Sequence, residues 1–220
     1  MAAPKLREVR LELQARLGFG AVDNPVIAPI LNSFINEAQE QLYAVGWFKS
    51  LEHVWSLTVI SGSSVTAYPT DSFGDLNPDR IIEVSANFGD AGNPAYREVK
   101  EGVTQNLRAQ VVESFPARYE RQFDGLAVFP PRDKDYPFQI KGMRALVALR
   151  DDDDRLSIDK PLVFALALAA GKSHYRHPDA QLYITKATGI LNSVKWQQSG
   201  PRIIKPKGCD EDPTPRPVVV

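Results

Sequence analysis

The chain has 220 residues, of which 43% are hydrophobic and 24% are charged, a mixture typical of a globular protein. Its 26 Lys and Arg residues nearly balance 27 Asp and Glu residues, so the net charge of −1 provides no global field toward nucleic acid or an anionic membrane. The single cysteine, Cys209, excludes an internal disulfide, and the longest apolar run, residues 162–170, is shorter than the roughly 20 residues that cross a bilayer.

Two helices are predicted at the start of the chain. Apolar residues recur at helical spacing over residues 6–17, between Pro4 and Gly18. The N-terminus of the chain contains Glu8 and Glu12 and no apolar central region, so we expect no secretory signal. A second apolar stripe covers residues 27–45 and ends at Gly46; its regular part begins either near Asn24 or only at Pro29.

The middle hundred residues are predicted to be mainly β. Residues 55–60 and 65–68 alternate in polarity around a Ser-Gly-Ser-Ser turn, which predicts a β-hairpin. Residues 80–86 predict a further strand with Ile82, Val84 and Ala86 on one face.

A second hairpin is predicted later in this region. Residues 118–123 and 126–129 are joined by Asp124-Gly125, the strongest two-residue hairpin signal in the chain. Residues 136–149 also alternate at first, but Gly142 and the alanines that follow leave the far half of this strand ambiguous.

Helices are predicted to return after the acidic stretch at residues 151–154, which we expect to be a solvated turn between two domains. Asp159 is predicted to cap a helix that continues to His177-Pro178. Because this helix is apolar on all sides, we expect it to be buried on more than one side, by its own domain or by a neighbouring subunit. A last helix has its apolar stripe over residues 183–194 and ends near residue 199.

The last twenty residues contain five prolines and cannot build a core, so we expect either a disordered tail or an arm that becomes ordered on a partner. A small basic cluster lies at its start, formed by Arg202, Lys205 and Lys207 around Ile203 and Ile204. These residues could contact phosphates, as in a nucleic-acid-binding module, or bind a protein edge as an extended strand. We favour the protein partner because no aromatic residues alternate with the charges.

Candidate chemical motifs are weak. Residues 170–173 read Ala-Gly-Lys-Ser, but the first glycine of a phosphate-binding loop is replaced by Leu166. His174 and His177 are three residues apart without further ligands at a metal-binding spacing, and the acidic stretch lacks the glycine and glutamate of a calcium loop. We therefore predict no catalytic residue, metal or cofactor, with a small metal-dependent enzyme as an alternative.

The order of elements resembles a known family. Residues 34–42 precede Gly46-Trp47-Phe48, and residues 57–62 lead to Tyr68-Pro69 and to residues 80–84. Residues 126–130, 136–140 and 161–170 continue the pattern. Together they resemble the head-to-tail adaptor proteins of tailed bacteriophages, of the connector or tail tubular type.

The resemblance implies a virion structural protein and not an enzyme. It implies a ring, usually of twelve copies, made in the host cytoplasm and placed at the head-to-tail junction, with portal and with tail nozzle, tube or fibre proteins as partners. Double-stranded DNA would pass through the ring during ejection. The partner-binding candidates are the basic cluster and, on the apolar helix, Leu162, Phe164 and Leu168.

The expected fold class is α+β. A helical bundle is formed by the N- and C-terminal helices, with a β-rich insertion and an extended C-terminal arm. The expected divisions are a first helical part at residues 1–46, the insertion at 47–150, a second helical part at 151–200 and the arm at 201–220.

Overall fold

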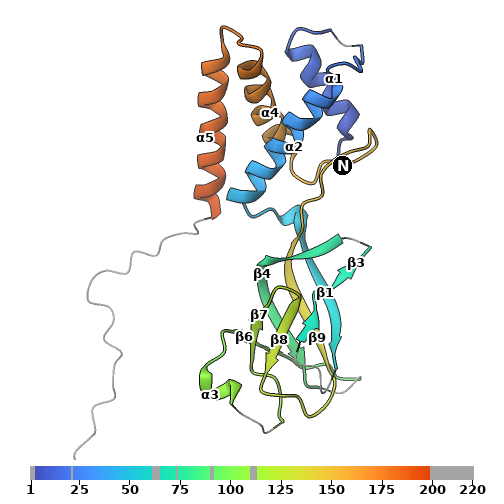
Figure 1. Ribbon diagram of the computed structural model, residues 1–220, viewed down its shortest axis with the longest axis vertical. Coiled ribbons are helices and arrows are strands. Elements are labelled where there is room, and N and C mark those ends of the chain that lie inside the picture. The colour runs from blue at the N-terminus through green and yellow to red at the C-terminus, as the bar shows by residue number, and fades with distance from the viewer. Residues whose placement is uncertain are drawn as a thin grey trace, which may run out of the picture.

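The chain is mixed α and β, with the long helices at one end and two sheets at the other (Figure 1). The computed structural model describes residues 3–20, 22–60, 65–72, 74–89, 92–109 and 113–198. The helices are α1 (Leu6–Arg16), α2 (Ala28–Val45), α3 (Gln105–Arg108), α4 (Lys160–His174) and α5 (Ala180–Gln198), with a 3-10 turn, η1, at Lys49–Leu51. The strands are β1 (Glu52–Val59), β2 (Val65–Ala67), β3 (Thr70–Asp71), β4 (Gly74–Asn87), β5 (Tyr96–Glu98), β6 (Lys100–Glu101), β7 (Arg118–Arg121), β8 (Gly125–Phe129) and β9 (Tyr136–Arg144).

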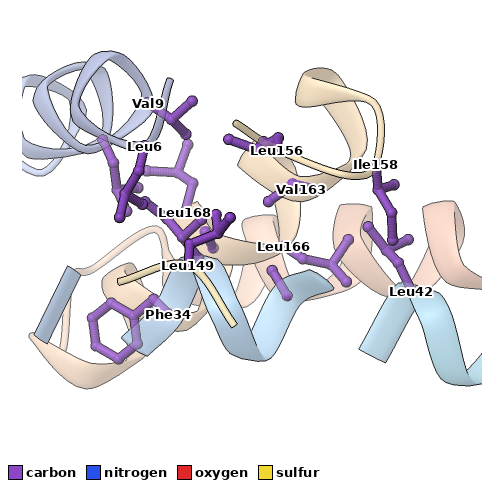
Figure 2. Packing of buried hydrophobic residues seen from close by; sticks show 14 of the residues in the cluster. Leu6, Val9, Phe34, Leu42, Leu149, Leu156, Ile158, Val163, Leu166 and Leu168 are labelled. Atoms are coloured by element: carbon purple, nitrogen blue, oxygen red, sulfur yellow. The ribbon is translucent and has the colours of Figure 1, made fainter. Parts of the chain in front are cut away.

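The four long helices confirm the predicted helical segments and share one hydrophobic core. α4 packs against α2, α5 and α1, and α1 also packs against α2. Figure 2 shows the side chains that meet there, among them Leu6 of α1, Leu42 of α2 and Val163 of α4. Burial of a leucine or valine side chain stabilises a fold by about 1.5–3 kcal/mol, so this cluster is a major source of stability.

The boundaries of α4 differ from the prediction. The helix ends at His174, three residues before the predicted stop, and Tyr175 follows as its C-cap. Asp159 does stand at the N-cap, but its side chain makes no capping hydrogen bond there. The proline at the start of the helix sets the first turn, where a backbone N–H is not needed.

The strands form two sheets. The larger has the order β1-β9-β4-β3, with β5 also paired to β4, and the smaller has the order β2-β8-β7-β6. Neighbouring strands are antiparallel except for β6 and β7. Their second hydrophobic core contains the fully buried Trp55, Phe138 and Ile140, and the indole N–H of Trp55 donates to the carbonyl of Gly74 at 3.1 Å.

The first predicted hairpin is wrong in its pairing. Residues 52–59 and 65–67 are strands, but β1 pairs along its length with β9, whereas β2 pairs with β8 in the other sheet. The predicted turn at residues 61–64 lies outside the described residues. Alternating polarity shows that a segment suits a strand but does not identify the strand beside it, since the partner is chosen by tertiary packing.

The second predicted hairpin is confirmed, with its turn one residue earlier than expected. β7 and β8 are antiparallel, and the N–H of Gln122 donates to the carbonyl of Gly125 at 2.8 Å, so Phe123 and Asp124 form the turn. Gly125 is therefore a strand residue, and a Cβ on it would lie 2.1 Å from the carbonyl oxygen of Thr66. The glycine is needed for the close approach of β2, and the exposed Phe123 occupies the tip.

The face assignment of β4 is wrong at Ile82. Val84 and Ala86 are buried as predicted, but Ile82 is exposed. The register against β9 shifts between Ile81 and Glu83, so Ile82 is an extra residue that breaks the alternation. β9 itself ends at Arg144, and the ambiguous residues 145–149 contain no strand.

Polar contacts join the two ends of the molecule. The hydroxyl of Tyr43 on α2 donates to the carbonyl of Arg144 at 3.0 Å and accepts from the amide of Asn77 at 2.7 Å. The Arg80 guanidinium donates to the carbonyls of Tyr43 and Ala44, both at 2.9 Å. These carbonyls belong to the last turn of α2, where they lack partners within the helix.

Candidate assembly surfaces

The acidic stretch before α4 is more than the solvated turn that the sequence predicted. The Arg10 guanidinium donates to both carboxylate oxygens of Asp152, at 2.6 and 3.2 Å, and to Asp23 at 3.0 Å. Arg10 is only 4% exposed, so its charge is neutralised inside the fold. The hydrogen bond from Arg10 lowers the pKa of Asp152, and the same contact raises the pKa of Arg10.

The neighbouring carboxylates are also engaged. Asp153 accepts from the Lys5 ammonium at 2.6 Å, and Asp154 accepts from the backbone N–H groups of Arg150 and Asp151 at 2.7 and 2.8 Å. These backbone hydrogen bonds lower the pKa of Asp154. The loop therefore holds the start of α1 in place, which is a structural role and not a cation site.

The two histidines near the end of α4 make separate contacts. The ring of His174 lies edge-on to Phe34 and Tyr175, with centroids 5.4 and 4.9 Å away. His177 instead contacts Asp179, with its Nδ1 2.9 Å from the carboxylate, and the buried Lys172 ammonium lies 3.1 Å from the same carboxylate. Burial acts to raise the pKa of Asp179, but the contacts with Lys172 and His177 outweigh it and lower the pKa.

Neither a metal site nor a membrane span is found in the part of the chain that the structure describes. There, no three His, Cys, Asp or Glu side chains are grouped as a metal ion would require. Within the same ranges, no helix has the length and apolar character needed to cross a membrane. Residues 170–173, which match part of a phosphate-binding loop motif, lie within α4 near its C-terminal end, as predicted.

The apolar helix α4 is covered mainly by its own chain. Leu168 is 6% exposed and lies in the core, while Leu162 and Phe164 are half-buried against it. Because α1, α2 and α5 surround this helix, its apolar character does not require a neighbouring subunit. The partner role predicted for these three residues stays a prediction, and Leu168 offers little surface for it.

The other predicted partner residues lie outside the described part of the chain. They are Arg202, Ile203, Ile204, Lys205 and Lys207, and the arm at residues 201–220 and Cys209 lie there as well. Their role as a partner-binding segment stays a prediction.

The exposed face of α5 that contains Leu182 and Trp196, here called its outer face, was not predicted from the sequence. Its buried face, over residues 183–194, was predicted correctly. The opposite face exposes Leu182 at 55% and Trp196 at 70% of their surfaces. A signal for this face was present, because Leu182 and Trp196 are large apolar residues that lie off the apolar stripe over residues 183–194.

A hollow of about 330 Å³ lies between α2 and the segment after β9. Its lining includes Asn36, Glu40, Tyr43 and Asn77, with residues 145–148 on the other side. The amide of Asn36 is already bonded to the backbone of Leu149, and burial raises the pKa of Tyr43, so its hydroxyl keeps its proton at neutral pH. These groups hold the segment against α2 and form no acid–base pair.

Comparison with known proteins supplies a family. The family model described as SU10 adaptor protein matches residues 6–206, which spans both the helical end and the sheets. A search of curated proteins found no match.

Proposed function

The chain belongs to the SU10 adaptor protein family, whose members are phage structural adaptors and not enzymes, and from this membership we propose that it forms a ring between portal and tail. The family confirms the resemblance to head-to-tail adaptors that the sequence indicated, and it implies a virion location with portal and tail proteins as partners. The match over residues 6–206 is the observation that carries the proposal.

In this proposal about twelve copies surround a channel through which the double-stranded genome leaves the head. A closed ring repeats one heterologous interface, so each copy presents two different surfaces to its two neighbours. The net charge of −1 suits a conduit, because DNA carries one negative charge per ~1.7 Å and a strongly basic wall would retain it.

We assign different contacts to the helical end and to the β-rich end of the molecule. Helices from both ends of the chain form the ring domain, with the β-rich segment between them facing tail proteins or fibres. The arm at residues 201–220 reaches a portal or a neighbouring copy. The polar bridge through Tyr43 and Arg80 supports this arrangement, because it links the ring domain to the sheets.

Electron microscopy of the purified chain mixed with its cognate portal ring tests the proposal. We expect a second ring, of about twelve copies, stacked on the portal. A chain lacking residues 201–220 should remain folded and dock poorly. Particles that show bare portals at saturating chain concentration would refute the adaptor ring, and unchanged docking of the truncated chain would refute the role of the arm.

A further inference from the structure

The outer face of α5 is exposed along its length. Leu182, Thr185, Gly189, Asn192 and Trp196 are all exposed and lie along one side, at the spacing of a coiled-coil seam. Bulky apolar side chains stand at the two ends of this seam, and small or polar ones lie between them. Figure 1 shows α5 at the outer edge of the helical layer, beside α4.

Gly189 leaves room on this seam for a second backbone to come close. Glycine in the middle of a helix is unfavourable relative to alanine, and Gly189 has neither a left-handed φ nor any atom within 4 Å of where its Cβ would lie. Nothing within the described part of this chain therefore explains the glycine. A helix of another molecule that packs at Gly189 would explain it.

The exposed face of α2 is a matched counterpart. Ile30, Ser33, Glu37, Glu40 and Ala44 lie along it at the same spacing of three and four, and the two helices have 18 and 19 residues. Ile30 supplies an apolar side chain at one end. The middle of this face carries two carboxylates, and neither makes an ion pair within the described ranges.

The charges of the two helices are complementary. α2 contains Glu37 and Glu40 and no basic residue, whereas α5 contains Lys186 and Lys195 and no acidic residue. The Lys186 ammonium lies 5.4 Å from the centre of the Tyr183 ring and remains on the surface. Opposite potentials on two surfaces steer their encounter and select their orientation.

We propose that the outer face of α5, residues 182–196, packs against the outer face of α2, residues 30–44, of a second copy of this chain. Because the two faces belong to different helices, each copy has one of each, and the contact can repeat from copy to copy. The inference rests on the proposed ring and identifies the surfaces through which neighbouring copies in that ring contact each other.

Charge reversal tests the contact on the full chain. Glu37→Lys with Glu40→Lys blocks the α2 face, and Lys186→Glu blocks the α5 face; all three positions are exposed, so the fold should be retained. We expect each variant to associate about tenfold more weakly than the natural chain in sedimentation experiments. Combining all three substitutions should restore part of the association, because the carboxylate introduced at position 186 then meets the two ammonium groups introduced on α2, while Lys195 keeps its charge.

A steric variant and a matched control complete the test. Gly189→Gln places a side chain where the second helix would lie, and it should abolish association while leaving circular dichroism unchanged. Glu83→Lys makes the same kind of charge change on an exposed site of β4 and should have no effect. A 1:1 mixture of the Glu37→Lys, Glu40→Lys variant and the Gly189→Gln variant should form dimers that do not grow further, since each pair has one intact contact and one contact that is blocked on both faces.

The outcomes separate this inference from the proposed function. A natural chain that fills portal rings while the blocked variants fill them equally well refutes this contact alone. A natural chain that associates through these faces but leaves portals bare refutes only the adaptor ring. A natural chain that neither associates nor fills portals refutes both.

Discussion

Arg10 joins three segments that are far apart in the sequence. It lies on α1 and donates to Asp23, before α2, and to Asp152, before α4, so it holds these two segments against α1. Its periodic neighbours on α1 are apolar, and the helical pattern identifies no partner for Arg10. Only the folded chain brings the two carboxylates to it.

Arg10→Met should therefore reduce the free energy of unfolding. We expect a loss of about 2 kcal/mol, below the roughly 3–5 kcal/mol found when a fully buried ion pair loses one partner, because Asp152 is 51% exposed. Urea unfolding followed by circular dichroism measures the loss. Arg7→Met is the control: Arg7 lies 3.7 Å from Asp23 on the surface, and its removal should change stability by less than about 0.5 kcal/mol. Equal losses in the two variants would contradict the role of Arg10.

The same cluster gives a direction for the pH dependence of stability. The pKa values of Asp152 and Asp154 are lowered in the folded chain, by the Arg10 hydrogen bond and by backbone N–H groups respectively. Their contribution is fully present above the unfolded value of about 3.9 and is lost as the pH falls through the folded values.

Unfolding measured between pH 6 and pH 2 should therefore show stability falling below about pH 4. Arg10→Met should fall less steeply, because Asp152 then titrates near its ordinary value in both states. Parallel curves for the natural chain and the variant would show that Arg10 is not the cause.

The hairpin of β7 and β8 shows which strand pairing a local sequence signal can decide. The Asp-Gly dipeptide predicted that β7 and β8 pair, since a two-residue turn leaves the chain little choice. The tip itself is Phe123-Asp124, because Gly125 is needed in the strand beside β2.

Gly125→Ala should destabilise the smaller sheet, because the new Cβ would lie 2.1 Å from the Thr66 carbonyl oxygen. We expect a loss of about 1–3 kcal/mol, the usual cost of overpacking, measured by chemical unfolding. Gly92→Ala is the control, since no atom lies within 4 Å of its Cβ position. A stable Gly125→Ala variant would mean that β2 does not pack this closely.

Two helical glycines should respond in opposite ways to the same substitution. Gly189→Ala should raise the stability of the isolated chain by up to about 1 kcal/mol, because alanine is the better helix former and its site is open. Gly171→Ala should lower it, because its Cβ would lie 2.9 Å from a methyl group of Leu17. Thermal unfolding compares the two, and a destabilised Gly189→Ala variant would show that the glycine serves the fold of the single chain.

Among the residues that the structure describes there are two hydrophobic cores, and β9 contributes to both. β9 contributes Met143 to the helical core and Phe138 and Ile140 to the core between the sheets. The Tyr43 and Arg80 hydrogen bonds cross the same boundary. Unfolding of the natural chain is therefore expected to be cooperative across both ends.

Tyr43→Phe combined with Arg80→Met should weaken this coupling while leaving both cores intact. Hydrogen exchange followed by mass spectrometry should then show the helices and the strands opening with different free energies, whereas the natural chain protects them more evenly. Arg97→Met, on β5 away from this boundary, should leave the pattern of protection unchanged. Identical exchange in the natural chain and the double variant would show that β9 alone couples the two ends.

Local patterns in the sequence determined the four long helices, the β-rich middle and the second hairpin, because helical spacing and a two-residue turn act over a few residues. They also determined the buried face of α5, since its apolar stripe is regular. The tertiary structure alone decided that β1 pairs with β9, that Arg10 meets Asp152, that Ile82 leaves the buried face and that α4 is covered by its own chain. Each of these features depends on interactions between distant parts of the chain. A short segment does not contain both partners, so its sequence cannot show the free energy that they contribute.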